Sequence, residues 1–342
     1  MSKPPVEVPQ GAIRFNTDSQ KMEFFAQDQW WEMETDVPYL GKATNSDIPG
    51  GPRGLIGGGA DPGFSTMVQA FDLTSSGSCF NFGSLSSGRY YIGGFASRTR
   101  AVWGGGSESG GYVDTIEYHT IPTGGSAVAF GELVGTDRHG LSGLANQTRG
   151  LYLGGENPSK IAEIDYVTIA STGDAKDFGD LSAARATTAA MASPTRGVSV
   201  GGIEGSAVNT IEYVTIATTG TRSDFGDQWK TVYGGGGGGN ATRGVVMGGY
   251  KHPANVKTIE YITIATTGNS AEFGEMAIER RYGATCSSSI RAVHCGGLNP
   301  AVEDTMDCIT IATQGDSVDF GNLHDHMYAI SHCGTSNAHG GL

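Results

Sequence analysis

Residues Thr210–Ala217 read TIEYVTIA, and a nearly identical octapeptide, TIEYITIA, begins at Thr258. Both are rich in β-branched residues, which favour extended backbone, so both predict β-strands. Their apolar side chains fall on both faces of the predicted strand, as in sheets that pack on both sides. Similar strands are predicted at three further places: TIEYHTI from Thr115, AEIDYVTIA from Ala162 and TMDCITIA from Thr305.

Two further markers repeat along the chain with the same spacing. A Phe-Gly pair recurs at intervals of 47 or 48 residues, at Phe82, Phe130, Phe178, Phe225, Phe273 and Phe320. An arginine followed shortly by Gly-Gly recurs at intervals of 47 to 49 residues, at Arg53, Arg100, Arg149, Arg196, Arg243 and Arg291. Two independent markers with one period near 48 indicate a repeat architecture.

The last unit of the repeat shows the predicted strand pattern most fully. Four strands are expected, over 282–287, 292–297, 305–312 and 317–320. Four short antiparallel strands in 40 to 50 residues are typical of a propeller blade. We attribute the Gly-Gly pairs to the convergence of adjacent blades on the propeller axis. The phenylalanine of each Phe-Gly pair is expected to be an apolar plug between blades.

Composition is consistent with a turn-rich all-β protein. The chain has 342 residues, of which 55 are glycine, 38% are hydrophobic and 17% are charged. This hydrophobic content with this little charge argues against wholesale disorder, and so much glycine disfavours a mostly helical protein. Gly234–Gly239 is a run of six glycines where a first strand is expected. We interpret the run as a strand tight against the axis or a locally irregular one.

The number of blades follows from the ends of the repeat. Six Phe-Gly fourth strands predict six blades over residues 53–342, but the first unit lacks a first strand. Met327–Cys333 (MYAISHC) resembles that missing strand when it is aligned with Arg281–Ser287, and it would close the ring beside the N-terminal unit and remove open sheet edges. Seven blades are the alternative, because Asn337–Gly341 (NAHGG) imitates a seventh second strand.

This pattern resembles the kelch repeat. In kelch blades an arginine precedes the first strand, Gly-Gly follows the second, a tyrosine lies in the third and an aromatic residue lies in the fourth. The arginine is matched by Arg89, Arg138, Arg185 and Arg281. The glycine pairs are matched by Gly154-Gly155, Gly201-Gly202, Gly248-Gly249 and Gly296-Gly297, and the tyrosine by Tyr118, Tyr166, Tyr213 and Tyr261. Phe-Gly stands where kelch blades usually carry Trp. The resemblance implies a kelch-like propeller and leaves function open, because propellers host many functions.

The first 36 residues differ from the repeat. Three strands are predicted over Gly11–Thr17, Lys21–Gln27 and Trp30–Glu34. They resemble a small β-meander common in bacteriophage tail and fibre proteins. A meander this small is marginal alone. Its aromatic residues, which are Phe24, Phe25, Trp30 and Trp31, therefore need a neighbour to cover them. That neighbour is a virion partner, another copy of the chain or the side of its own propeller. Residues 37–52 contain three prolines and are interpreted as a linker.

Charge and cysteine content limit the classes of partner. A formal net charge of −13 disfavours nucleic acid and anionic membranes. No apolar run is long enough to span a membrane, and the N-terminus MSKPPVEVPQ lacks a secretory signal, so synthesis in a cytoplasm is expected. Five cysteines form no expected disulfide framework. Four of them and several histidines fall late in the chain, but neither CxxC nor HxxxH spacing occurs, so buried thiols are predicted rather than a metal site.

The sequence provides little evidence for catalysis. Three polar clusters lie on connections between units: Asp137-Arg138-His139, Glu279-Arg280-Arg281 and His324-Asp325-His326. The last could bind a metal or act in acid–base chemistry, although a solvated loop is the simpler interpretation because no third ligand is placed by spacing. Nucleophile elbow, P-loop and HExxH motifs are absent. We therefore predict no catalytic residue, no metal and no cofactor.

Binding is expected on the loops between second and third strands, which vary most. Scaffold elements repeat, whereas loops carry function. The candidate contact residues for a partner or a glycan are Tyr112, Lys160, Tyr250, Lys251 and His252. Each of them is equally consistent with a surface loop that has no role.

Together these features suggest a non-enzymatic structural protein of a tailed-phage virion, in the tail, fibre, neck or capsid surface, made in the cytoplasm of the host bacterium. Expected partners are other virion proteins, further copies of the chain and a host-surface glycan. Two alternatives remain open. One is a propeller enzyme, either glycan-active or of the oxidase type, and the other is an intracellular kelch-like interaction module.

Overall fold

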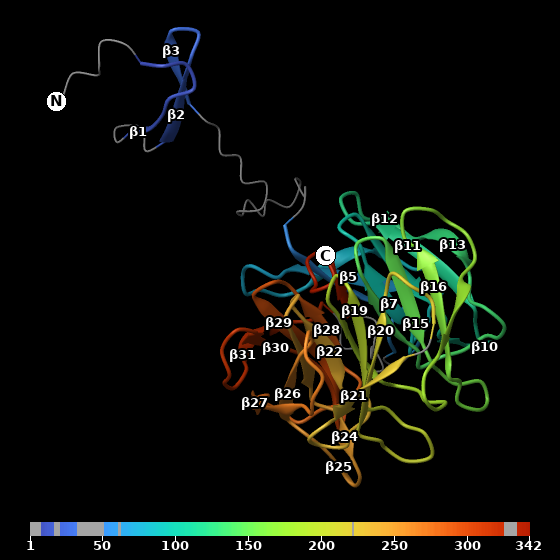
Figure 1. Ribbon diagram of the computed structural model, residues 1–342. Helices are drawn as coiled ribbons and strands as arrows, with labels where there is room; N and C mark the ends of the chain where they lie inside the picture. Colours follow the sequence, from blue (N-terminus) through green and yellow to red (C-terminus); the bar gives the residue numbers. More distant parts are fainter. Residues whose placement is uncertain (1–7, 17–20, 33–50, 61–62, 221, 325–333) are drawn as a thin grey trace. The chain divides into compact units, whose positions relative to one another are not determined.

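The computed structural model describes residues 8–16, 21–32, 51–60, 63–220, 222–324 and 334–342 (Figure 1). The chain divides into two compact units, Met1–Leu40 and Gly41–Leu342. Strands are the regular elements of both units, and the described residues contain no helix. The all-β prediction is therefore confirmed. Most of the predicted linker, residues 37–50, lies outside the described residues.

The small unit is a three-stranded antiparallel sheet, with strand order β1-β2-β3. Its strands are β1 (Ile13–Asn16), β2 (Lys21–Ala26) and β3 (Gln29–Glu32). Gln27 and Asp28 connect β2 to β3 with φ angles of 53° and 59°, as in the two-residue turns that match the twist of a hairpin. β1 begins two residues later than predicted, β2 ends one residue earlier and β3 begins one residue earlier, whereas Thr17, Met33 and Glu34 lie outside the described residues.

The four aromatic residues of the small unit lie on opposite faces of its sheet. Phe25 pairs with Trp30, and the Arg14 guanidinium lies 4.1 Å from the centre of the Trp30 ring. Phe24 pairs with Ile13 and with Trp31, so these three share the other face, which also carries Phe15. That second face is open, since Ile13, Phe15 and Trp31 are 58%, 57% and 44% exposed. The aromatic residues therefore do not form one patch.

The described residues of the large unit contain six sheets of four or five strands, which we number I to VI along the chain. The strands of sheets I to III are β4 (Arg53–Gly57), β5 (Met67–Asp72), β6 (Phe80–Ser84) and β32 (Gly334–Ser336); β7 (Gly93–Ala96), β8 (Arg100–Gly104), β11 (Thr115–Thr120) and β13 (Val128–Glu132); and β14 (Ser142–Ala145), β15 (Arg149–Leu153), β16 (Glu163–Thr168) and β17 (Lys176–Asp180). The strands of sheets IV to VI are β18 (Ala189–Ala192), β19 (Arg196–Val200), β20 (Thr210–Thr215) and β21 (Ser223–Asp227); β22 (Gly236–Gly239), β23 (Arg243–Met247), β26 (Thr258–Thr263) and β27 (Ala271–Glu275); and β28 (Ala284–Ser287), β29 (Arg291–Asn299), β30 (Ala301–Thr310) and β31 (Val318–Asn322).

Three short additions decorate these sheets. β12 (Gly125–Ser126) pairs in parallel with β6 of sheet I. Two small hairpins extend the loops between second and third strands: β9 (Ser107–Glu108) with β10 (Gly111–Tyr112), and β24 (Tyr250–Lys251) with β25 (Ala254–Asn255). In sheet VI the predicted loop instead continues the β29–β30 ladder, because Asn299 and Ala301 pair across a tight turn.

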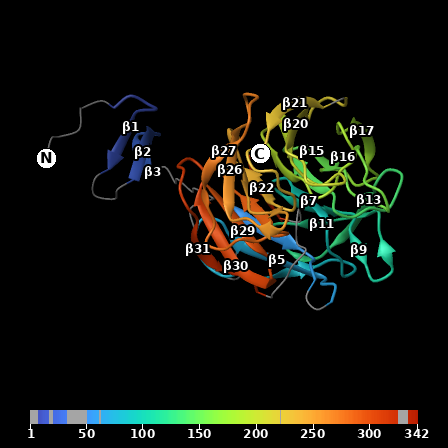
Figure 2. The same cartoon turned by 90° about the horizontal axis from the view of Figure 1, so that it is seen from below.

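The six sheets follow one another in chain order around a common centre (Figure 2). Their first strands contact each other in the order β7, β14, β18, β22, β28, β32 and back to β7. Close approach there explains the six-glycine run, which forms β22. A Cβ atom on Gly237 would lie 2.5 Å from backbone atoms of Ala190 in the neighbouring sheet, a separation that only glycine tolerates.

The Gly-Gly pairs have a different role from the one predicted. They do not lie at the centre but just after the second strand of sheets I to V and within β29 of sheet VI, and both glycines adopt left-handed backbone, as at Gly154 (φ 59°) and Gly155 (φ 115°). A Cβ atom on Gly154 would lie 2.3 Å from the carbonyl oxygen of Arg185 in the next sheet. The Gly155 amide donates to that same oxygen at 3.0 Å. The pairs therefore join neighbouring sheets through backbone.

Two further bonds join neighbouring sheets. A turn glycine of the next sheet donates its amide to the carbonyl of the Phe-Gly phenylalanine, as Gly173 does to Phe130 at 2.7 Å. The arginine that begins a second strand donates to a carbonyl at the end of the next sheet's third strand, as Arg149 does to Ile216 at 2.9 Å. The arginine bond recurs at all six junctions, whereas the glycine bond recurs at five and is replaced between sheets I and II by the pairing of β12 with β6. All six phenylalanines are at most 9% exposed, which confirms that they are apolar plugs.

The C-terminal residues complete sheet I. The predicted strand Met327–Cys333 lies outside the described residues. The strand that pairs with β4 is β32, which follows directly after this range in the chain. Residues 337–341 form turns instead of a second strand. Between sheets VI and I the same bonds recur: Arg291 donates to the Thr74 carbonyl at 3.0 Å, and the Gly77 amide donates to Phe320 at 2.9 Å.

Asn337 offers a test of this C-terminal pairing. Its side-chain oxygen accepts the Arg53 amide at 2.8 Å, as Asn240 accepts the Arg243 amide at 2.8 Å within sheet V. Because each cap secures one turn, we expect Asn337→Ala and Asn240→Ala to lower the free energy of unfolding by a similar amount, about 1 kcal/mol. Chemical denaturation of the two variants measures this. A destabilised Asn240→Ala beside an unaffected Asn337→Ala would contradict the pairing of β32 with β4.

Candidate ligand-binding face

A buried arginine–carboxylate pair connects the chain between sheets to the third strand that follows. The pairs are Arg89–Glu117, Arg138–Asp165, Arg185–Glu212 and Arg280–Asp307. All eight residues are at most 3% exposed. Removing one partner of such a pair leaves an uncompensated buried charge, which costs about 3–5 kcal/mol. The pairs therefore hold each connection firmly to its sheet.

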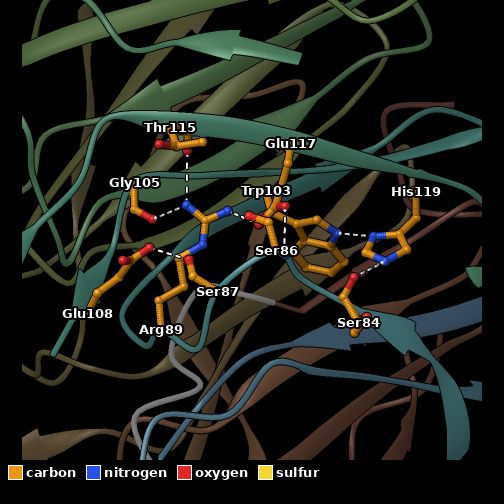
Figure 3. Close-up of polar contacts among 10 residues, drawn as sticks. All are labelled: Ser84, Ser86, Ser87, Arg89, Trp103, Gly105, Glu108, Thr115, Glu117 and His119. Atoms are coloured by element: carbon orange, nitrogen blue, oxygen red, sulfur yellow. Dashed lines mark hydrogen bonds and ion pairs between the residues drawn. The ribbon is translucent and has the colours of Figure 1, made fainter. Parts of the chain in front are cut away.

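Arg89 shows the arrangement in detail (Figure 3). It donates to the carbonyl oxygens of Gly105 and Thr115 at 3.1 and 3.0 Å and forms an ion pair with Glu117. Glu117 in turn accepts the amide of Ser86 at 3.0 Å. Both ends of the connection that carries Arg89 are thereby bonded to sheet II.

Two sheets depart from this pairing. In sheet V the position of the arginine is taken by Val232, and burial raises the pKa of Glu260, which accepts Ser270 Oγ at 2.6 Å and the Lys230 amide at 2.9 Å. In sheet I the acid is replaced by Gln69, whose side-chain oxygen accepts the His324 amide at 2.6 Å. In both sheets a third-strand side chain therefore still accepts a backbone amide of the connection, although the ion pair is absent.

The buried arginine of sheet VI is Arg280, whereas Arg281 was predicted for this position. Arg280 is fully buried and its Nη2 lies 2.5 Å from Asp307 Oδ2. Arg281 points elsewhere, with its guanidinium 4.5 Å from the Tyr250 ring centre and 5.4 Å from that of Tyr282. Two adjacent arginines made the sequence alignment ambiguous, and only burial separates their roles.

Residues that follow these arginines form an inner ring of left-handed backbone. Its members are Tyr91, Gly140, Thr187, Gly234 and Tyr282, with φ between 53° and 65°. From Gly140 onward, each member's amide donates to the preceding member's carbonyl at 2.7 to 3.1 Å. Glycine adopts this conformation freely, whereas a tyrosine or threonine is strained by it. Retained strain of this kind concentrates at functional sites.

Aromatic side chains gather around this ring, and we call them the aromatic face. Its members are Phe64, Tyr90, Tyr91, Tyr112, His139, Tyr233, Tyr250 and Tyr282. The Tyr91 and Tyr282 rings meet edge to face with centres 5.4 Å apart. Burial raises the pKa of both phenols, that of Tyr282 to about 12. Both therefore remain neutral hydroxyl groups across the physiological range.

The predicted binding residues divide into two groups. Tyr112 stacks on His139 with ring centres 4.2 Å apart, and Tyr250 meets Tyr233 at 5.4 Å, so both belong to the aromatic face. His252 lies beside Tyr250, with ring centres 6.3 Å apart. Lys160 instead forms an ion pair with Glu156 at 3.6 Å, and Lys251 is exposed on β24.

The sequence analysis missed most of the aromatic face. Phe64, Tyr90, Tyr91, Tyr233 and Tyr282 were not among the expected residues. A signal was present, because four of these five follow the arginine or valine that begins each connection, as in RYY at Arg89–Tyr91. The equivalent residues elsewhere are His139-Gly140 and Ala186-Thr187. The two positions after the arginine or valine recur in each connection, but the side chains at them differ, and this variation indicates the aromatic face.

Other candidate sites receive less support. Among the described residues no three His, Cys, Asp or Glu side chains are placed to hold a metal ion. Asp325 and His326 lie outside that part of the chain. Cys79, Cys286, Cys295 and Cys308 are buried free thiols, as predicted. No helix of the described chain is long and apolar enough to cross a membrane.

The centre of the large unit holds a small cavity of about 50 Å³, lined by first-strand residues and by His339 and Gly340. His339 Nε2 donates to the Ala96 carbonyl at 2.7 Å, and the Gly340 amide donates to Gly239 at 3.0 Å. A space of this size holds a few waters. The C-terminal residues therefore take up most of the centre, and the aromatic face is the better candidate for a ligand.

Comparison with known proteins adds no relative. The sequence matches no protein-family model and no curated protein.

Thr187 tests the strain in the inner ring. Its φ is 53° and its hydroxyl has no hydrogen-bond partner. Thr187→Gly should raise the free energy of unfolding by about 1 kcal/mol, because glycine adopts left-handed backbone without strain. Thr187→Ala keeps a Cβ atom and should bring no such gain. Thermal denaturation compares the two, and a less stable glycine variant would show that the position is unstrained.

Glu260 tests the buried carboxylate without an arginine. Its pKa lies above the ordinary 4.5, so folding binds a proton and stability falls as pH rises through and above that value. Glu260→Gln removes this dependence, and its stability advantage over the native chain should grow between pH 4 and pH 8. Asp307→Asn is the control, since it leaves Arg280 unpaired and should lose about 3 kcal/mol. Melting temperatures across pH measure both, and parallel profiles for Glu260→Gln and the native chain would refute the assignment.

Proposed function

We propose that the large unit is a kelch-like six-bladed β-propeller and that the chain is a non-enzymatic structural component of a tailed-phage virion. On this proposal each of sheets I to VI is one blade, and β32 closes the ring. The cyclic contacts of the first strands support this. So does the recurrence, between sheets VI and I, of the arginine and glycine bonds that join the sheets from II through VI to one another.

The aromatic face is the observation that carries the functional part of the proposal. Its rings come from separate sheets, yet contact one another continuously from Phe64 through Tyr91 to Tyr250. Aromatic side chains with a polar tip are typical of contact surfaces. The buried arginines and acids beneath them are engaged with each other, so the face offers rings and hydroxyls for binding a virion partner or the host surface.

The small unit supports attachment to the virion. Ile13, Phe15 and Trp31 leave one face of its sheet open, and an isolated three-stranded sheet with an open apolar face is more stable when that face is covered. We propose that another virion protein or further copies of the chain cover it. On this proposal the propeller contacts a partner or the host surface.

The small unit's open face can be tested in the assembled particle. The native chain should be found by mass spectrometry in purified virions, and Phe15→Ser with Trp31→Ser should abolish its recovery because the apolar contact is lost. Val128→Ser is the control, since Val128 is 53% exposed on the large unit, and should be recovered normally. Absence of the native chain from virions would overturn the virion assignment, and normal recovery of the double variant would overturn the attachment role.

A further inference from the structure

We propose that the aromatic face binds an uncharged oligosaccharide, laid across two flat ring platforms. The first platform is Phe64 on Tyr90, and the second is Tyr112 on His139. This inference rests on the proposed function, because it names the ligand of the same surface. Three features of the platforms carry it: their shape, their rigidity and the groups beside them.

Both platforms are parallel stacks whose outer ring is open. Phe64 and Tyr90 lie 5.2 Å apart at 9° between planes, and Tyr112 and His139 lie 4.2 Å apart at 16°. Phe64 and Tyr112 are 41% and 37% exposed although one side of each is covered by its partner. The opposite side of each ring is therefore available. A flat apolar surface of this kind matches the C–H face of a pyranose ring.

The two platforms are connected through Tyr91. Its ring centre lies 4.9 Å from that of Tyr90 and 5.8 Å from that of His139. Tyr91 takes the left-handed conformation that Gly140 and Gly234 adopt without strain at equivalent positions of the ring. A bulky residue kept where glycine fits better indicates that the ring itself is needed. The aromatic surface is thus continuous between the platforms, as a ligand of several sugar units requires.

Backbone bonds fix the platforms before any ligand arrives. Tyr90 and Ser107 exchange two backbone hydrogen bonds of 3.1 and 2.9 Å, and Ser107 pairs with Tyr112 across the β9–β10 hairpin. His139 is held in the same manner by Glu156, with an additional bond from its Nδ1 to the Glu156 carbonyl at 3.0 Å. Surfaces fixed in advance lose little conformational entropy on binding.

Hydrogen-bonding groups flank each platform. Glu108, which contacts Ser87, lies on the hairpin that carries Tyr112. Asn157 lies beside the second platform, where its amide donates to the Asp137 carbonyl at 2.6 Å. Carboxylate and amide groups beside flat rings suit a ligand with an apolar face and hydroxyl edges, since the ring orients the sugar and the polar groups select its hydroxyls.

Charge favours an uncharged ligand. The chain carries a net charge of −13, and Glu108 and Asp137 lie close to the platforms, so an anionic sugar would be repelled. A cationic ligand would bind best over the faces of aromatic rings. Arg281 already covers the faces of Tyr250 and Tyr282, which are two tyrosines outside the two platforms. A neutral sugar meets neither obstacle.

The test is binding of the full-length protein to neutral oligosaccharides of glucose, galactose and mannose, two to six units long, with sialylated and sulfated sugars in parallel. We expect at least one neutral series to bind more tightly as it lengthens. Phe64→Ala and Tyr112→Ala should each weaken that binding about tenfold. Phe80→Ala is the matched control, because Phe80 is 36% exposed but lies on β6, away from the platforms, and should leave affinity unchanged. Melting temperatures verify that each variant is folded.

Several outcomes would overturn the assignment. It fails if no neutral sugar binds, if only charged sugars bind, or if binding persists in the Phe64→Ala, Tyr112→Ala double variant. Virions that carry the double variant separate this failure from that of the proposed function. If the double variant loses host-cell attachment and the native protein binds no sugar, the carbohydrate proposal is overturned. The aromatic face would then contact a protein of the host surface. Unchanged attachment and absent sugar binding would overturn both proposals.

Discussion

The buried arginine–carboxylate pair is the interaction on which the rest of the large unit depends. It links a connection between sheets to the third strand of the next sheet, with both charges removed from water. Such a pair contributes little net stability against apolar residues of similar size, but it tolerates no displacement, because a separated charge would be buried alone. It therefore acts chiefly to specify position. Tyr90 and Tyr91 follow Arg89, and His139 follows Arg138, so these members of the aromatic face inherit that position.

A second constraint is the backbone contact between neighbouring sheets. Phe-Gly, Gly-Gly and the second-strand arginine each bond to the following sheet through main-chain groups. Such contacts need glycine where backbones meet, and they are insensitive to the side chains at the loop tips. The scaffold can therefore carry different residues on each loop without altering how the sheets pack. That independence explains how one repeat supports an aromatic face that is itself not repeated.

Much of the scaffold could be predicted because its markers recur. Phe130 and its counterparts were expected to be buried and are, and the third strands lie close to their predicted ranges. Prediction was poorer where the repeat is ambiguous or interrupted. Arg281 was chosen over Arg280 because periodicity cannot separate adjacent arginines. The predicted strand Met327–Cys333 lies outside the described residues, which resume with β32 at Gly334. Tyr91 and Tyr282 were missed since a search for recurring residues passes over positions occupied in turn by Tyr, Gly, Thr, Gly and Tyr.

By itself the sequence determined the class of structure: β-strands of known order, with one period near 48, glycines at close backbone contacts and a separate meander at the N-terminus. These follow from local preferences and spacing, which a linear chain displays directly. Only the tertiary structure decided which side chains meet. Phe64 stacks on Tyr90, Tyr91 meets Tyr282, and Phe25 pairs with Trp30 across the small sheet. Such contacts join residues from separate sheets or depend on strand register, and neither is specified until the sheets are placed side by side.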